Sequence, residues 1–396
     1  GISGKVPVTT KHFDINFGIN TNAIRMAYVS AEEIGFNTNF LYEIDSIAEN
    51  AISENAIPGC QILIAKEGKI FFNKSYGYHT YDKKVVVKNS DVYDIASITK
   101  IASTVPILMQ MVDERDLDLD DELGKYLELD STNKEHLIIR EILAHQAGLY
   151  PWIPFYKKTL VKDSISGIMN LRDTLYNEEF SKDFPFKVSD NIYIHYSYPD
   201  SIINQIIDSE LFEKKEYIYS DLGYYLLKKI IEKNYGKALS NIVSDKFYRK
   251  LGMENLGYLP MERLAKERLV PTEDDFLFRS QLLKGYVHDM GAAMQGGIGG
   301  HAGLFSNAND LAKLMQMYLQ NGEYAGERYL SEEVVKEFTK CQFSNNKNRR
   351  GAGFDKPALG EHEGGPASKN ASHEGFGHTG FTGTLVWADP KTQIVY

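Results

Sequence analysis

Two polar side chains three residues apart could give this chain a nucleophile and its activator. Ser97 and Lys100 form an S-x-x-K pair at the start of an apolar run that extends to Val112. On a helix this spacing returns the amine to the face that carries the hydroxyl, and a partly desolvated lysine can lose its proton and activate a serine. The backbone N–H of Ser97 and the helix dipole would favour a developing oxyanion. The competing interpretation is a helix-capping serine followed by a surface lysine.

The same four-residue pattern occurs twice more, and the surrounding sequence separates the three copies. Ser131 and Lys134 follow an acidic loop, whereas Ser344 and Lys347 lie in a polar run rich in Asn and Lys. Only the copy at Ser97 opens an apolar helix. We therefore take Ser97 as the candidate nucleophile.

A tyrosine on a loop before a second apolar helix is a candidate proton carrier. Tyr219 precedes a predicted helix at 222–234. A phenol beside a Ser/Lys pair can act as a general base if cationic neighbours lower its pKa. The alternative is an ordinary core tyrosine in a chain that has 25 of them.

A glycine-rich segment before a predicted strand could form the other wall of a site. The segment at 377–383 reads G-H-T-G-F-T-G. Glycines on an edge strand let a substrate backbone approach closely, so the N–H of Phe381 is a candidate second oxyanion donor, while His378, Thr379 and Gly380 are candidates for substrate contact. The alternative is a simple turn before a strand.

The elements that must position these residues follow from periodicity and turn signals. Two β-rich runs flank Glu67-Gly68, which predicts a hairpin, and residues 150–215 are Tyr-rich and irregular with short helices expected. The predicted helices are 41–57, 97–112, 135–147, 222–234, 238–249, 308–320 and 331–339, and the predicted strands are 60–66, 69–77 and 383–388.

This order of elements predicts a sheet shared by the two ends of the chain. We expect an α/β sheet domain from 41–115 together with 270–396, and an inserted, mostly helical domain at 116–269. Residues 1–40 are polar with weak periodicity and are interpreted as an N-terminal extension or linker. The chain begins with Gly rather than Met, which suggests processing or excision from something longer.

Bulk properties exclude several classes of function. The formal net charge is −10 over 396 residues, so nucleic acid would be repelled, and the short basic run 347–350 is interpreted as a solvated loop. Two cysteines, Cys60 and Cys341, are too few for a disulfide scaffold. The most apolar segment, 101–112, is too short to span a bilayer, so no transmembrane segment is predicted.

Metal and cofactor chemistry find no support in the sequence. His288, Asp289 and His301 lack the spacing of a metal motif and are interpreted as loop-fixing hydrogen bonders. No phosphate-binding loop, dinucleotide fingerprint or G-x-S-x-G elbow is present. We predict a reaction that needs neither metal nor cofactor.

The three candidate segments occur in an informative order. The S-x-x-K at Ser97, then Tyr219-Ser220-Asp221, then His378-Thr379-Gly380 resembles the S-x-x-K, Y-x-N and K-T-G triplet of the serine β-lactamase and penicillin-binding-protein superfamily. The resemblance covers about residues 41–396. It implies an α+β fold of the β-lactamase/transpeptidase type, an antiparallel sheet flanked by helices with an inserted helical domain.

The resemblance also implies roles for individual residues. Ser97 would be acylated, Lys100 would activate it, and Tyr219 would carry the proton to the leaving group. The N–H groups of Ser97 and Phe381 would form the oxyanion hole. The segments around Asp221 and His378 would line the substrate side, with Thr379 and Gly380.

Two departures from the family pattern bear on the substrate. Asp221 stands where the family has Asn, so an amide donor is replaced by an acid that would accept hydrogen bonds or bind Lys100. His378 stands where the family has Lys, which weakens a fixed positive charge. Both changes argue against efficient β-lactam hydrolysis and favour a carboxypeptidase, amidase or esterase branch. A literal S-D-N at 189–191 leads into an extended run, so Tyr219 is the preferred second element.

The first residues carry a second, shorter resemblance. The stretch at 4–9 is similar to the end of family 3 glycoside hydrolases, which implies the C-terminal module of a fusion with a β-N-acetylglucosaminidase. That would make peptidoglycan or a muropeptide the shared substrate and the bacterial periplasm or envelope the location. At the other end, the family's sheet usually continues past Val386, so a final strand is expected to be shortened or missing.

Two hypotheses therefore remain. The first is a serine hydrolase that forms an acyl-enzyme on peptide, amide, ester or β-lactam carbonyls. The second is a catalytically weak or inactive module attached to a glycosidase, which the changes at Asp221 and His378 favour and the set Ser97, Lys100 and Tyr219 opposes.

Overall fold

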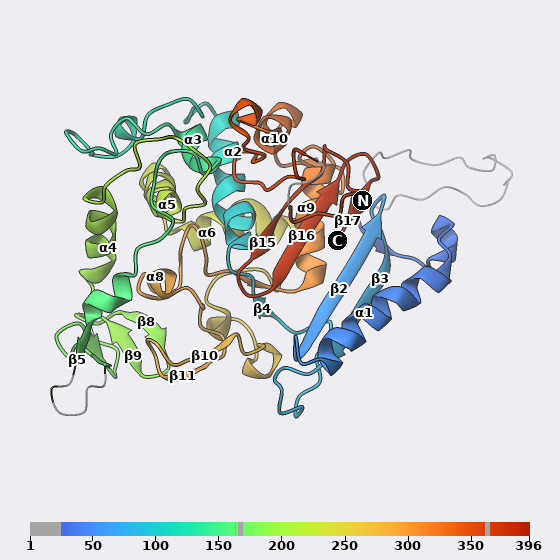
Figure 1. The fold of residues 1–396 in the computed structure, drawn as a ribbon, viewed down its shortest axis with the longest axis horizontal. Coiled ribbons are helices and arrows are strands. Elements are labelled where there is room, and N and C mark those ends of the chain that lie inside the picture. Colours follow the sequence, from blue (N-terminus) through green and yellow to red (C-terminus); the bar gives the residue numbers. More distant parts are fainter. Residues whose placement is uncertain (1–24, 163, 165–168, 361–364) are drawn as a thin grey trace, which may run out of the picture.

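The structure is a computed structural model that describes residues 25–162, 164, 169–360 and 365–396. The glycosidase-like stretch at 4–9, and with it most of the predicted extension, lies outside the described residues. Figure 1 shows a sheet on one side of the molecule, helices and short strands on the other, and helix α2 (Val105–Asp113) between them.

The two ends of the chain share one six-stranded sheet, as predicted. All neighbouring pairs are antiparallel except β1 and β3, which are parallel, so the sheet is mixed rather than purely antiparallel. In spatial order the strands are β1 (Ala27–Tyr28), β3 (Lys69–Gly77), β2 (Gly59–Lys66), β17 (Ile394–Val395), β16 (Thr384–Asp389) and β15 (Phe376–Gly380).

Local turn chemistry explains the strand connections. The β2–β3 hairpin is confirmed, and its two turn residues Glu67 and Gly68 both have positive φ, at 52° and 73°, as a tight two-residue hairpin turn requires. The final strand β17 is short but present, and it joins the two halves of the sheet through Ile394 opposite Lys66 and opposite Asp389.

Helices cover the sheet and bury its apolar residues. Helix α1 (Leu41–Ser53) packs along β2 and β3, and α9 (Ala308–Leu319) packs against β2, β16 and β17. The helix that Ser97 opens is π-helical over Lys100–Thr104 (η3) before it becomes α2, and it is buried almost throughout. Because this helix is buried, its sequence is mostly apolar after the polar residues Ser97 and Lys100.

The helical layer differs from the predictions in two places. The helix predicted at 135–147 is only α3 (Ile139–Leu143), because Leu137 and Glu135 accept backbone hydrogen bonds from Leu123 and Gly124. The region 150–215 contains mainly short strands rather than short helices. Its described elements are the short 3-10 helix η5 (Phe155–Thr159), β5 (Leu160–Lys162), β6 (Met169–Leu171), β7 (Tyr176–Asn177), β8 (Phe186–Ser189), β9 (Ile192–Ile194) and α4 (Tyr198–Ile207).

The remaining helices occur close to their predicted positions. They are α5 (Leu222–Tyr235), α6 (Leu239–Val243), continued by Ser244–Tyr248 (η6) and α7 (Arg249–Leu251), and α10 (Glu332–Thr339). The short helix α8 (Met290–Ala293) was not predicted. Short strands complete the fold: β4 (Tyr93–Asp94) with β12 (Phe305–Ser306), β10 (Glu273–Asp275) with β11 (Gln281–Leu283), and β13 (Glu323–Tyr324) with β14 (Glu327–Arg328).

A close contact between α3 and α5 generates a stability prediction. A Cβ at Gly223 would lie 2.2 Å from Cγ2 of the buried Ile142, so this glycine lets α5 lie against α3. Gly223→Ala should lower the free energy of unfolding by about 1–3 kcal/mol through overpacking, although alanine favours a helix by about 1 kcal/mol.

Urea unfolding of a double-mutant cycle checks the cause. In an Ile142→Ala background the same Gly223→Ala change should cost nothing or stabilise, because the clashing methyl group is gone. Additive effects of the two substitutions would contradict this account of the contact.

Candidate active site

Ser97 lies at a strained bend that exposes it at the start of its helix. The preceding residue, Ala96, has φ of 44°, which is unusual for a residue with a side chain, and its N–H donates to Asp94 Oδ1 at 2.8 Å. Ser97 itself is partly exposed, whereas Ile98 and Lys100 behind it are fully buried. The bend therefore presents one hydroxyl to solvent from an otherwise buried segment.

Lys100 is the charged centre of the site. Its Nζ lies 3.0 Å from Ser97 Oγ, 2.7 Å from Asp221 Oδ1 and 3.4 Å from the carbonyl oxygen of His301. The lysine side chain has 0% exposure and that of Asp221 has 21%. Of the two alternatives raised for Asp221, the structure thus has it bind Lys100, and no substrate contact is needed to account for it.

The ion pair determines the protonation state of the lysine. Burial lowers the pKa of Lys100, but the nearby Asp221 carboxylate and the Tyr219 hydroxyl raise it by more, so that the pKa lies above its usual value. The expectation that desolvation frees the amine of its proton is wrong for the resting site. Lys100 is an ammonium that donates to Ser97 Oγ.

Tyr219 faces the same ammonium with its ring. Lys100 Nζ lies 4.9 Å from the ring centroid, and the ring packs on His145 at 4.3 Å between centroids. Burial raises the pKa of Tyr219; the charge of Lys100 opposes this, Asp221 reinforces it, and the net pKa is above the usual value. The hydroxyl is buried without an aligned hydrogen-bond partner among the described residues. At rest it is a neutral phenol and not the anion that a base would require.

The structure corrects the predicted position of His378. The ring is 1% exposed, its Nε2 accepts from Arg350 at 3.1 Å, and its Nδ1 donates to the Thr379 carbonyl at 2.7 Å. Burial and the nearby charges of Arg350 and Lys100 hold its pKa well below the usual value. His378 is therefore a neutral group behind Tyr219, and its side chain does not line the open side of the site.

Arg350 is the site residue that the sequence analysis missed. The basic run 347–350 was interpreted as a solvated loop, yet Arg350 is 4% exposed, pairs with Asp355 at 3.3 Å and lies 5.2 Å from the Tyr219 ring centroid. It supplies a permanent positive charge beside Tyr219, where the family pattern has a lysine at the position of His378. The glycines at 351 and 353 were the available signal that this run enters a packed region.

The end of β15 lies against the segment that carries Ser97. A Cβ at Gly380 would lie 2.5 Å from the Ile95 carbonyl oxygen, and Thr382 Oγ1 donates to the Asp94 carbonyl at 2.7 Å. Phe381, at the turn, is 82% exposed, and Thr379 is also exposed. Within the part of the chain that the structure describes, neither Ser97 N–H nor Phe381 N–H donates a hydrogen bond.

The other sequence candidates have structural explanations. Ser189 ends β8, and residues 190–191 form the turn between β8 and β9. Lys134 is buried and donates to Asn133 Oδ1 at 2.6 Å, with no bond to Ser131 in the described chain. His301 contacts Asp289 at 2.8 Å and His288 contacts Glu273 at 3.0 Å; no cluster of three metal-ligating side chains was found among the residues described.

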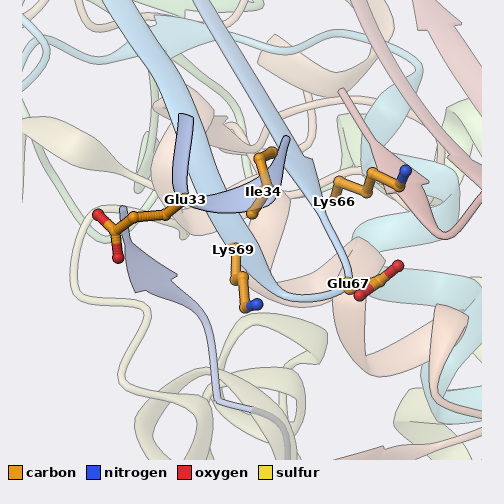
Figure 2. A pocket seen from close by; sticks show the side chains of 5 residues that line it. All are labelled: Glu33, Ile34, Lys66, Glu67 and Lys69. Atoms are coloured by element: carbon orange, nitrogen blue, oxygen red, sulfur yellow. The ribbon is translucent and has the colours of Figure 1, made fainter. Parts of the chain in front are cut away.

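A separate hollow lies away from this site. It has a volume of about 250 Å³ and surrounds the β2–β3 turn, where the tips of Glu33 and Lys66 point in opposite directions (Figure 2). None of its lining residues belongs to the group around Ser97. Across the described ranges, no helix combines the length and the apolar character that crossing a membrane demands.

The contact between Arg350 and His378 predicts that the family's lysine is not tolerated here. His378→Lys would bury a second cation against the Arg350 guanidinium, so the free energy of unfolding should fall by about 3–5 kcal/mol. Urea unfolding measures this. His378→Gln is the matched control, because its amide oxygen can still accept from Arg350, and equal losses in both variants would contradict the electrostatic cause.

The buried histidines also predict a pH dependence of stability. Burial holds the pKa values of His145 and His378 well below 6.5, so both stay neutral when folded but gain protons when unfolded. The free energy of unfolding should therefore fall as the pH drops below about 6.5, by about 1.4 kcal/mol per pH unit for each histidine. In His378→Gln, the free energy of unfolding should change less steeply with pH between pH 6.5 and 5, by about 1.4 kcal/mol per pH unit. An unchanged slope would contradict the prediction.

Several known proteins are similar to this chain in sequence or in fold. A protein of Escherichia coli (strain K12) named "Putative D-alanyl-D-alanine carboxypeptidase" is 30% identical, with 92% of this chain and 83% of that protein covered. An N-acetylmuramyl-L-alanine amidase of Bacillus subtilis (strain 168) is 28% identical over 94% of this chain and 83% of its own. A penicillin-binding protein homologue from Caulobacter crescentus has a similar fold, with a TM-score of 0.63 and 18% identity over 89% of each chain.

A family comparison extends this likeness over most of the sequence. The Beta-lactamase family profile matches residues 44–396, which include every candidate residue from Ser97 to Phe381. The chain belongs to the Beta-lactamase family.

Proposed function

We propose that this chain is a serine hydrolase that forms an acyl-enzyme on Ser97 with peptide or amide substrates. The observation that carries the proposal is the 3.0 Å contact between Lys100 Nζ and a partly exposed Ser97 Oγ, at a bend beside two uncommitted backbone N–H groups. A nucleophile, a fixed cation and oxyanion donors are the parts that acyl transfer requires.

Each residue is given one role in the reaction. Ser97 Oγ attacks the carbonyl carbon, and the Lys100 ammonium holds Oγ in place and stabilises negative charge that develops there. The N–H groups of Ser97 and Phe381 receive the oxyanion; each such donor contributes about 10²–10³ in rate. Tyr219, a neutral phenol at rest, donates its proton to the leaving nitrogen, which suits its raised pKa.

The substrate class is inferred from the relatives and from the charges of the site. The two relatives described above are named as a D-alanyl-D-alanine carboxypeptidase and an N-acetylmuramyl-L-alanine amidase, and both names contain alanine. We infer that the substrate is a cell-wall peptide or muropeptide and that the protein acts outside the bacterial cytoplasm. The buried, neutral His378 leaves no motif cation to recruit a carboxylate, so β-lactams should be poor substrates.

A catalytically silent module is the second candidate. The observation that favours it is the Asp221–Lys100 ion pair, which keeps the lysine protonated and unable to accept the Ser97 proton. The two candidates differ in whether Ser97 becomes covalently modified.

Labelling with an acylating probe decides between them. A fluorophosphonate should modify the wild-type chain at Ser97, as located by peptide mass spectrometry, because the hydroxyl is exposed and held by Lys100. Ser97→Ala should abolish labelling, and Lys100→Ala should lower its rate at least about 100-fold. Ser344, the serine of another S-x-x-K copy, supplies the matched control: Ser344→Ala should label like wild type. A wild-type chain that no acylating probe modifies would establish the silent module.

The substrate class is tested on the purified chain. Release of alanine or of a peptide from muropeptides should exceed hydrolysis of a penicillin by at least about tenfold in kcat/KM. Faster hydrolysis of the penicillin would show that the site recognises β-lactams despite the changes at Asp221 and His378.

A further inference from the structure

Among the residues that the structure describes, the proton of Ser97 has no acceptor in contact with its hydroxyl. Lys100 is already an ammonium and donates to Oγ, while Tyr219 is a buried, neutral phenol. An attacking serine must nevertheless lose its proton as the bond to carbon forms. The acceptor must therefore lie one step further along a contact that the structure shows.

Asp221 occupies that position. Its Oδ1 lies 2.7 Å from Lys100 Nζ, which in turn lies 3.0 Å from Ser97 Oγ, so direct contacts connect hydroxyl, amine and carboxylate; at rest Oδ1 has no aligned hydrogen bond among the described residues. Both separations are within the range over which a proton moves between nitrogen and oxygen. The carboxylate is 21% exposed and Lys100 is fully buried, so these contacts lie in a water-poor region.

The local structure shows that this carboxylate does not cap the helix that follows it. Asp221 is the residue before α5, a position where aspartate usually caps the helix by accepting from its first N–H groups. Here the side chain makes no capping hydrogen bond, and Leu222 N–H donates to Ser220 Oγ instead. The carboxylate does not cap the helix and instead forms an ion pair with Lys100.

We propose that Asp221 is the final acceptor of the Ser97 proton, which reaches it through Lys100. One Nζ–H bond of Lys100 breaks and its proton joins Asp221 Oδ1, which leaves a lone pair on Nζ. As the Oγ–C bond forms, the Oγ–H bond breaks and this lone pair takes the proton. Lys100 remains an ammonium, Asp221 becomes a neutral acid, and its negative charge appears on the substrate oxygen. This inference rests on the proposed acyl-enzyme function.

The return step restores every group. When the tetrahedral adduct collapses, the leaving nitrogen takes the Tyr219 proton and departs as an amine. The Asp221 proton then passes through Lys100, which lies 4.9 Å from the Tyr219 ring centroid, and regenerates the phenol. The acyl-enzyme is left with Asp221 as carboxylate, Lys100 as ammonium and Tyr219 as phenol, as at the start.

Replacement of Asp221 by the family's asparagine separates this role from simple positioning. Asn has nearly the same shape and keeps an oxygen toward Lys100, but it cannot take a proton. If Asp221 only positions Lys100, Asp221→Asn lets burial lower the lysine pKa and should leave or improve acylation. If Asp221 accepts the proton, the rate should fall.

The experiment measures the limiting rate of fluorophosphonate labelling and the half-saturating probe concentration at neutral pH. We expect Asp221→Asn to reduce the limiting rate at least 100-fold with little change in the half-saturating probe concentration. The limiting rate of Asp221→Glu should be at least tenfold higher than that of Asp221→Asn. Tyr219→Phe should reduce probe labelling less than Asp221→Asn does, because the probe's leaving group needs no proton. Thermal unfolding of each variant verifies that it is folded.

The outcomes distinguish this inference from the function on which it rests. Wild-type labelling together with equal or faster labelling of Asp221→Asn would overturn the role of Asp221 and leave the serine hydrolase intact. If Asp221→Asn does not fold, Asp221→Glu decides alone: labelling within tenfold of wild type supports the role, and loss beyond 100-fold in a folded protein overturns it. A wild-type chain that does not label overturns the hydrolase and this inference together.

Discussion

The structure around Ser97 depends on one unfavourable event, the complete burial of the Lys100 ammonium. A buried charge is tolerated only when it is paired and its remaining contacts are polar. Asp221 provides the pair at 2.7 Å, and Ser97 Oγ and the His301 carbonyl provide the rest. These partners come from the bend before η3, the start of α5 and the glycine-rich segment before β12. Neutralising one lysine thus brings three distant parts of the chain together, and the geometry of the site follows from it.

The same principle organises a second buried cation behind the first. Arg350 is paired with Asp355 and donates to His378, and its guanidinium lies 5.2 Å from the centroid of the Tyr219 ring, which Lys100 and His145 also contact. Each cation has its own carboxylate, so the tyrosine lies between two balanced charges rather than in a net positive field. Burial then dominates, and the phenol stays protonated. A neutral histidine in the third motif is a consequence of this arrangement, because a guanidinium already occupies the place where its charge would lie.

The sequence predicted the elements that short-range signals encode. The Glu67-Gly68 hairpin, the helix after Ser97 and the helices after Asp221 each carry a turn residue or an apolar period, and all three occur in the structure. The short α3 was not predictable, because residues 135–138 form a turn and a β-bridge that pair with residues 122–124, and no local pattern reports this pairing. Arg350 was missed for a similar reason: a polar run reads as solvated unless its partners, Asp355 and His378, are known to surround it. Long-range pairing of polar groups leaves no periodic trace in a sequence.

The two departures from the family triplet are therefore best understood as one rearrangement of charge. The family pattern has cations in the first and third motifs and a neutral amide in the second. In this chain the cation near the third motif is Arg350, which lies outside the motif and is paired with Asp355. The amide of the second motif is replaced by the carboxylate of Asp221, which pairs with Lys100. A site with two unpaired cations can lower the pKa of its tyrosine and use it as a base. A site with both cations paired loses that option, but it gains a carboxylate in contact with the lysine. Under the proposal made above, the site therefore keeps a base, the Asp221 carboxylate in contact with Lys100.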